Sequence, residues 1–343
     1  MQMLKKHAGT IAKIASIIAF ATPIMILYFL YPQTFEPVWT GTWKNRVYHL
    51  FFIWLLCLET ILSWEELHTA KLRLKSVKAI AFIILLLLPT IYVIVANYYG
   101  LNDWIVSLSK QYGVKSDWAE LMPLSAEYLV FAVLCALLAF THYGKKGMKD
   151  YSISTFFPAL MGTIYTIDNV YPFGKFTPFQ ILVQPTAIIV ANVLNMMGYQ
   201  TSIIFIENHP VYGSMPLLMI ENSHAPPLGI SWPCAGIESL IIYTLTILLF
   251  LKKTIISLKH KIIYFVIGAI VTYLINILRI VTIAVIAANG GDWGLIHDYY
   301  GQLYSITWII SYPLIIIGSR ILWNKIKHQK PASMDQPNLP IST

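Results

Sequence analysis

Long apolar runs separated by short polar segments make up most of the chain. Each run is close to the ~20 mostly apolar residues that an α-helix needs to cross a bilayer. Eight runs are clear, at residues 11–31, 47–63, 78–97, 124–142, 152–170, 235–251, 262–287 and 303–323. This pattern predicts an all-α polytopic membrane protein with about eight transmembrane helices.

The positions of Lys and Arg predict the orientation of these helices. Most of the 24 Lys and Arg residues fall in five segments, which are LKKHAGTIAK, KLRLKSVK, YGKKGMKD, LKKTIISLKHK and RILWNKIKHQK. Loops rich in Lys and Arg stay on the cytoplasmic side of a membrane. We therefore expect the N-terminus and the C-terminus to be cytoplasmic, and the loops that carry few basic residues to lie outside.

A ninth run, 180–198, is weaker because it carries Gln184, Pro185, Asn192 and Asn195. If this run crossed the membrane, the basic segment LKKTIISLKHK would lie outside, against the charge rule. Polar segments that contain proline are tolerated at membrane depth where they line a protein cavity. We therefore expect 180–198 to be a re-entrant or interfacial helix on the outer side.

The remaining segments complete the predicted domain organisation. The outer segment 199–233 contains SIIFIE and PLLMIE, which we interpret as short strands separated by NHPVYG. Residues 1–328 form a single integral membrane domain. The tail, 329–343, holds three prolines and no apolar run, so we expect it to be disordered and cytoplasmic.

Composition agrees with the membrane class and argues against a nucleic-acid partner. Hydrophobic residues make up 57% of the chain and charged residues 12%, whereas a soluble domain carries about 25% charged residues. The net charge of +8 reflects membrane topology, because no basic run has the interleaved aromatic residues of a nucleic-acid surface. Two interpretations are open for the outer aromatic residues, Trp232 among them: a belt at the membrane interface, or the lining of a substrate groove.

Cys234 is set apart from the other two cysteines. Cys57 and Cys135 lie in the middle of apolar runs, as packing residues do, whereas Cys234 lies at the outer start of its run, in SWPCAGIESL. Pro233 suits the first turn of a helix, where the positive end of the helix dipole favours a thiolate. Gly236 lets a substrate or another backbone approach closely. A packing residue and a nucleophile are both open interpretations of Cys234.

Glu238 lies four residues after Cys234, so the two side chains share one face of a helix. An ionised carboxylate at this place would oppose formation of the thiolate. The alternative is that Glu238 binds substrate or pairs two helices.

Arg279 lies within an apolar run, in NILRI, about 12 Å below the outer end of its helix. A charge at this depth costs about 3 kcal/mol on insertion scales, so it marks either a functional site or a buried ion pair. Glu59 and Asp168 are the intramembrane acids that could pair with it. A functional Arg279, with Asn276 on the same helical face, would bind a carboxylate or stabilise an oxyanion.

His297 lies in GGDWGLIHDYYGQ, the outer loop between the last two runs, with Asp298 as its neighbour. An imidazole can act as base or acid near neutral pH. The predicted topology brings Cys234, Arg279 and His297 to the same face of the membrane. A thiol, a base and an electrostatic stabiliser are the groups that acyl transfer through a thioester requires.

We expect neither a metal nor another cofactor. Glu207, His209, Glu221 and His224 lie in the outer segment, but their spacing matches no known pattern of metal ligands.

The segments PCAGIESL, NILRI and HDYYG resemble the three signature segments of the exosortase/archaeosortase family, which are polytopic membrane transpeptidases. The resemblance covers about residues 190–310, the expected catalytic part. It implies that Cys234 is the nucleophile, His297 the general base and acid, and Arg279 the group that binds an oxyanion or carboxylate. Beside these three residues we expect substrate-binding or supporting roles for the following residues: Asn276, Glu238, Gly236 and Asp298.

The resemblance also implies a substrate class and a location. Enzymes of this family cleave exported proteins whose C-terminal tail has a short motif, a transmembrane helix and a basic cluster. They form a thioacyl intermediate and pass the new C-terminus to an acceptor, a membrane lipid in the archaeal cases. The active site would face outwards from the plasma membrane. Ala235 stands where bacterial members commonly have Ser, and Glu238 where a basic residue is frequent, which favours the archaeal branch.

Two other functions remain open from the residues alone. A transporter would use Arg279 and Glu59 along a translocation path, and it should tolerate Cys234→Ala. A non-catalytic assembly partner would bind exported proteins without changing their mass.

Overall fold

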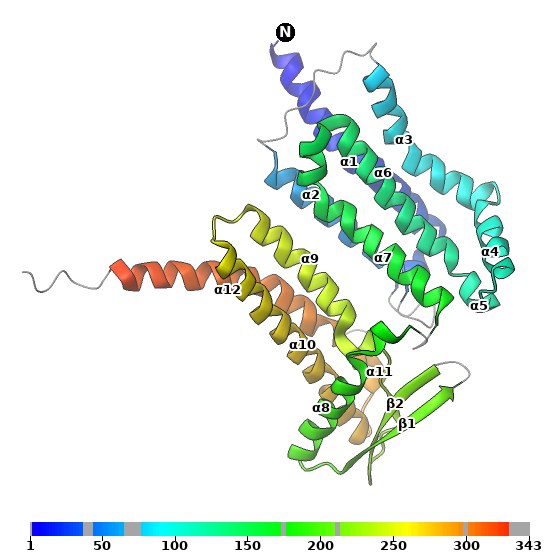
Figure 1. Cartoon of the computed structure of the whole chain (residues 1–343), viewed down its shortest axis with the longest axis vertical. Coiled ribbons are helices and arrows are strands. Elements are labelled where there is room, and N and C mark those ends of the chain that lie inside the picture. The colour runs from blue at the N-terminus through cyan, green and yellow to red at the C-terminus, as the bar shows by residue number, and fades with distance from the viewer. Residues whose placement is uncertain are drawn as a thin grey trace, which may run out of the picture.

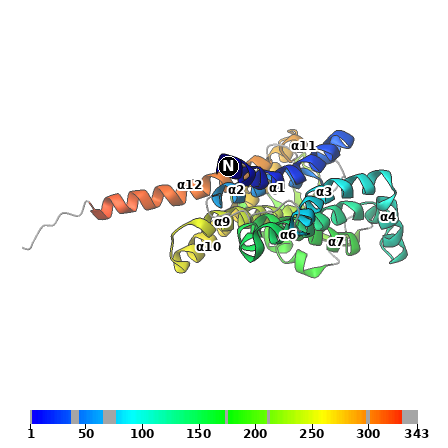
Figure 2. The ribbon, with the colours of Figure 1, turned by 90° about the horizontal axis from the view of Figure 1, so that it is seen from above.

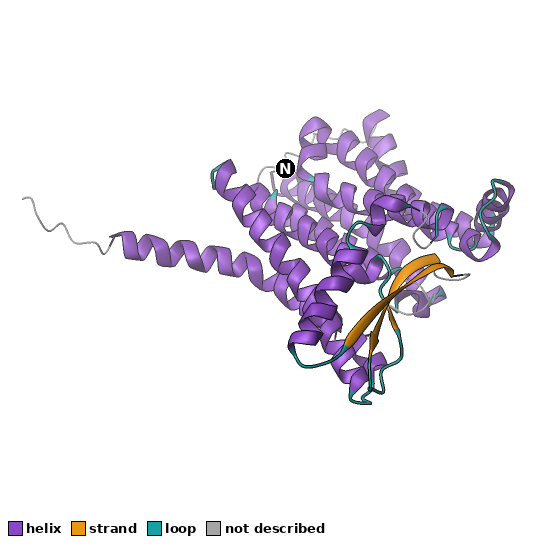
Figure 3. Cartoon of the chain, turned by 60° about the horizontal axis from the view of Figure 1, so that its bottom comes forward, coloured by secondary structure: helices purple, strands orange, loops and turns teal. Residues whose placement is uncertain are grey.

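The computed structural model describes residues 2–36, 44–64, 77–172, 176–209, 213–297 and 301–328. The predicted tail 329–343 and Asp298 lie outside these residues. The described chain is mostly helical and carries one small sheet (Figures 1 and 3). Its helices are α1 Gln2–Leu30, α2 Val47–Leu62, α3 Val77–Tyr98, α4 Leu101–Gln111, α5 Ser116–Ala119, α6 Met122–Asp150, α7 Ser152–Val170, α8 Val183–Met196, α9 Glu238–Lys253, α10 Leu258–Ala288, α11 Trp293–Leu295 and α12 Gly301–His328.

All eight predicted runs fall on helices, which confirms the all-α polytopic membrane fold. Six described helices are long and apolar enough to cross a membrane: Ile80–Tyr98, Ser116–Asp150, Pro178–Met196, Pro233–Lys252, Leu258–Ala288 and Leu303–Trp323. Shorter apolar helices cover Ile14–Leu30 and Val47–Leu62. The run 152–170 forms α7, whose buried Asp168 and Asn169 make it more polar than these.

Two segments differ from the sequence prediction. The basic segment YGKKGMKD, predicted as a loop, continues α6 to Asp150, with a kink at Gly144, where φ is +66°. The stretch between the third and fourth apolar runs contains α4 and α5. Neither short helix carries an apolar run long enough to be recognised as a membrane helix.

The first half of the chain forms a bundle of α1, α2, α3, α6 and α7. Its core includes Phe20, which makes edge-to-face contacts with Phe52 and Phe131 at centroid distances of 5.2 and 5.7 Å. At the start of α2, Arg46 makes a two-pronged ion pair with the buried Glu127 of α6, with both contacts at 3.0 Å. Buried charges are tolerated when they are paired in this way.

The second half packs α9, α10 and α12 against one another, and α9 joins the first bundle through α7. Figure 2 shows α12 reaching away from the rest of the molecule. A largely buried ion pair connects the halves, because Lys252 Nζ of α9 lies 2.7 Å from Glu59 Oε1 of α2. The backbone N–H of Ser154 donates to the same carboxylate at 2.8 Å.

A three-stranded antiparallel sheet lies beside α8 and the C-terminal end of α10 (Figure 1). Its strands are β1 Thr201–His209, β2 Gly213–Ile220 and β3 Leu228–Gly229, and Thr201 pairs with Ile220. The two predicted strands are therefore confirmed.

The segment predicted to be re-entrant or interfacial forms α8, which packs against both long strands and α10. Pro178–Met196 has the length and composition of a span. Its α-helical part begins only at Val183 and holds 14 residues. At 1.5 Å per residue this part is about 21 Å long, against a hydrocarbon core of about 30 Å. That α8 does not cross the membrane remains a prediction.

Candidate active site

The segment SWPCAGI forms a sharp elbow between the sheet and α9. Residues Pro233–Ile237 make one wide helical turn, and α9 begins at Glu238. Gly236 has φ +92°, a conformation that residues with a side chain rarely adopt. A Cβ at this position would lie 3.0 Å from Asn276 Nδ2. Gly236 is therefore required by both its backbone conformation and the close approach of Asn276.

Asn276 fixes this elbow to the middle of α10. Its side chain is buried, and Nδ2 donates a hydrogen bond of 2.9 Å to the carbonyl oxygen of Cys234. A buried amide that loses its partner costs about 1–3 kcal/mol. The bond consequently holds Cys234 beside the helix that carries Arg279. The supporting role of Asn276 remains a prediction, and this hydrogen bond is the contact through which it would act.

A buried polar network holds the elbow from the other side. Trp232 is 1% exposed, and its indole N–H donates to Asp168 Oδ1 at 3.0 Å. Lys44 Nζ lies 2.7 Å from Asp168 Oδ2 and donates to Asn169 Oδ1, also at 2.7 Å. Burial lowers the pKa of Lys44 to about 8, while the Asp168 carboxylate opposes this shift. The interpretation of Trp232 as part of an interfacial belt is wrong, because the side chain is buried and its indole donates to Asp168 inside the protein.

The Cys234 thiol lies next to His297 and Arg279. It is partly buried, and a side-chain hydrogen bond links it to His297. Ser231 Oγ lies 3.6 Å from the sulfur and donates to it. The Arg279 guanidinium is close enough to act on the thiol electrostatically. Three segments far apart in sequence therefore meet here: the elbow, α10 and the turn after α11.

Arg279 makes two kinds of contact with this group. Its Nη2 donates to the backbone carbonyl of His297 at 3.2 Å, which fixes the turn that carries the imidazole. Its Nε is buried and has no hydrogen-bond partner in the described part of the chain. An unpaired buried N–H is unfavourable, so this atom is available to a bound ligand.

The two acids predicted as possible partners of Arg279 are engaged elsewhere. Glu59 pairs with Lys252, and Asp168 pairs with Lys44. The alternative of a salt bridge from Arg279 to either of them is therefore not observed.

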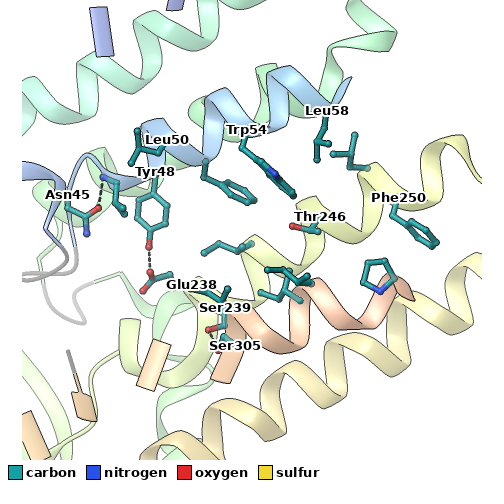
Figure 4. Close-up of a pocket in the computed structure, with 18 of the residues that line it drawn as sticks. Asn45, Tyr48, Leu50, Trp54, Leu58, Glu238, Ser239, Thr246, Phe250 and Ser305 are labelled. Atoms are coloured by element: carbon teal, nitrogen blue, oxygen red, sulfur yellow. Dashed lines mark hydrogen bonds between the residues drawn. The ribbon is translucent and has the colours of Figure 1, made fainter. Parts of the chain in front are cut away.

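Among the described residues, Glu238 lies close enough to Arg279 for the two charges to interact. Glu238 is also hydrogen-bonded by the Tyr48 hydroxyl of α2, and the two side chains face each other in Figure 4. Of the alternatives left open for Glu238, the pairing of two helices is observed. Tyr48 gave no signal in the sequence, because it lies in an ordinary apolar run.

No group of three His, Cys, Asp or Glu side chains among the described residues could hold a metal ion. The predicted supporting residue Asp298 lies outside the described residues. Ser231 and Trp232 were not singled out as site residues, although both stand next to Pro233 in the same segment.

Comparison with known proteins gives one family match. The family model described as transmembrane exosortase matches residues 39–312, which is more than half of the 343-residue chain. The match includes Cys234, Arg279 and His297, and it extends far beyond the segment 190–310 on which the resemblance was based. No curated protein and no solved structure matches the chain. The preference for the archaeal branch remains a prediction.

The network behind the elbow gives a testable consequence. Asp168→Asn leaves the buried Lys44 without its counter-charge, so we expect a loss of about 3–5 kcal/mol of stability. The loss is measured as a lower midpoint of thermal unfolding in detergent. The matched control is Asp103→Asn, because Asp103 is exposed and its change should stay within about 0.5 kcal/mol. Equal midpoints for both variants would show that the network does not support the fold.

Proposed function

Because the chain belongs to the transmembrane exosortase family, we propose that it is a membrane cysteine transpeptidase. Its substrates are exported proteins with a C-terminal sorting tail made of a motif, a transmembrane helix and a basic cluster. It cleaves this tail at the outer face of the plasma membrane and transfers the new C-terminus to an acceptor, a membrane lipid. The observation that carries the proposal is the hydrogen bond between Cys234 and His297, with Arg279 beside it.

The first half of the reaction forms a thioester. His297 takes the proton of the Cys234 thiol, and the thiolate attacks the carbonyl carbon of the scissile peptide bond. The carbonyl oxygen becomes an oxyanion, which the nearby guanidinium of Arg279 stabilises. His297 then gives its proton to the departing amine, so the tail leaves with a new N-terminus. The exported protein remains attached to Cys234 through a thioester.

The second half transfers the acyl group. His297 takes a proton from the hydroxyl or amine of the acceptor, which attacks the thioester carbon. The C–S bond breaks, and the thiolate recovers a proton from His297. A water molecule in place of the acceptor would give hydrolysis instead.

Two features of Arg279 support its assigned role. Its Nη2 holds the carbonyl of His297, so guanidinium and imidazole are fixed relative to each other. Its buried Nε lacks a partner among the described residues, and an oxyanion or a carboxylate would satisfy it. A planar guanidinium can make both contacts at once, whereas the ammonium of Lys is a point charge.

The alternative of a transporter has less support. It requires Glu59 and Arg279 along one path, but Glu59 is bound by Lys252 and by Ser154. The alternative of a non-catalytic assembly partner is tested by the same experiment as the main proposal.

The direct test uses intact mass. The substrate probe is an exported protein from the same genome that ends in an apolar segment of about 20 residues and a Lys/Arg cluster. Co-expressed with the wild type, it should lose the mass of its tail, while Cys234→Ala should leave it at full length. Cys135→Ala is the matched control, since this buried cysteine should not affect processing. Processing by Cys234→Ala would end the nucleophile assignment, and binding with no change of mass would favour the assembly partner.

Arg279 can be tested separately by a change that keeps its charge. Arg279→Lys should slow processing by about 10²–10³-fold, the loss caused by removing one oxyanion donor. Arg320→Lys is the control, because Arg320 lies about 22 Å along α12 from Ser305, which lines the cavity beside Arg279. The measurement is the rate at which the full-length probe disappears. Equal rates for both variants would show that Arg279 does not stabilise the oxyanion and has only a structural role.

A further inference from the structure

A cavity of about 840 Å³ lies between α2, α9 and α12, and we call it the α2–α9–α12 groove. Arg279 and Glu238 lie at one end of it, and Leu62 and Thr254 at the other. Figure 4 shows side chains from these helices projecting into the space between them. Apolar groups form most of its walls, including Trp54, Leu58, Ile242, Phe250, Ile306 and Ile310.

The groove follows one face of α9 along nearly the whole helix. Its lining residues on α9 recur every three or four positions, at Glu238, Ser239, Ile242, Thr246, Leu249, Phe250 and Thr254. At 1.5 Å per residue, Glu238 and Thr254 are about 24 Å apart along the helix. This length exceeds the ~15 Å of one leaflet and approaches the full hydrocarbon core of about 30 Å. A chain that fills the groove therefore passes through both leaflets.

The groove is open to the side. Several of its apolar lining residues are exposed, including Leu50 and Trp54 on α2 and Ile306 and Ile310 on α12. In a membrane protein such an opening faces lipid. Its occupant can therefore enter from the bilayer.

The floor of the groove carries small hydroxyl residues. Ser239 and Ser305 share a hydrogen bond of 3.0 Å between their hydroxyls. Thr246 is 9% exposed, and its Oγ1 has no hydrogen-bond partner within the described residues. Small and hydroxyl residues are typical of places where membrane helices pack closely and form hydrogen bonds. This floor suits a helix better than it suits a lipid chain, which offers no polar partner.

The groove is also continuous with the candidate active site. Arg279 lines its end and also lies beside the Cys234 thiol. A polypeptide that leaves the groove at this end arrives directly at the nucleophile.

We propose that the α2–α9–α12 groove binds the transmembrane helix of the substrate's tail, so that the peptide just before this helix reaches Cys234. This proposal rests on the proposed function, because it takes the tail-bearing protein as the substrate. A polypeptide that spans the hydrocarbon core must satisfy its own backbone hydrogen bonds, so the bound segment is helical. The length of the bound substrate helix then determines the distance between the Arg279 end of the groove and the peptide bond that is cleaved.

The test compares two exposed positions on α12. Ile310 lines the groove and is 60% exposed, whereas Ile315 is 51% exposed, does not line the groove and lies on the opposite face of α12. A photo-crosslinking p-benzoyl-phenylalanine is placed at either position in the Cys234→Ala variant of the full chain, in membranes that contain the tail-bearing probe. We expect a covalent adduct with the mass of both proteins from position 310 and none from position 315. Adducts to lipid alone at position 310, or equal adducts from both positions, would overturn the proposal.

A second pair of variants measures the same contact in the active protein. Ile310→Trp should slow processing of the probe by at least about tenfold, the factor that a clash of about 1.4 kcal/mol produces. Ile315→Trp should process at the wild-type rate, and equal rates for both would contradict docking in the groove. Because the crosslink needs no catalysis, the two proposals can fail separately. An adduct without processing by the wild type would contradict only the transpeptidase, and processing without an adduct would contradict only the groove.

Discussion

The hydrogen bond from Asn276 to the carbonyl of Cys234 is the constraint on which the rest of the site depends. It connects the elbow, which follows the sheet, with the middle of α10. It also requires a residue without a side chain at position 236. Once this bond is made, the thiol lies beside the helix that carries Arg279. Arg279 in turn holds the carbonyl of His297. One buried amide thus determines the relative positions of three groups that are distant in sequence.

Buried charges give the surrounding scaffold its rigidity. Lys44 with Asp168, Arg46 with Glu127, and Lys252 with Glu59 each join segments that are far apart in the chain. Apolar contacts alone hold membrane helices together weakly, because lipid tails solvate apolar side chains as well as a neighbouring helix does. An ion pair between two helices resists their relative movement more than an apolar contact does, since separating the two charges exposes both of them to hydrocarbon. The pair of Lys252 with Glu59 holds α9 to α2 near one end of the groove, which leaves the apolar stretch of both helices free to line it.

Local patterns predicted the helices and singled out Cys234, Arg279 and His297, which the structure brings together. They could not predict the long-range contacts. Apolar runs indicated the helix positions, and the distribution of Lys and Arg was sufficient to predict that Cys234, Arg279 and His297 share one face. The partner of Asp168 could not be predicted, because Lys44 lies in a loop 124 residues away and nothing local connects them. The same applies to Glu238, whose partner Tyr48 comes from the other half of the chain. α4 and α5 were missed because helices as short as these leave no long apolar run.

The central claim is that Cys234 carries the substrate as a thioester, and the most direct measurement is the mass of the peptide that contains it. Wild-type protein mixed with the tail-bearing probe is quenched in acid and digested, and the peptides are weighed before and after treatment with hydroxylamine. We predict that the Cys234 peptide gains the mass of the probe's new C-terminal acyl fragment and loses it with hydroxylamine. Processing of the probe with an unmodified Cys234 peptide, or with the adduct on Cys57 or Cys135, would contradict this claim.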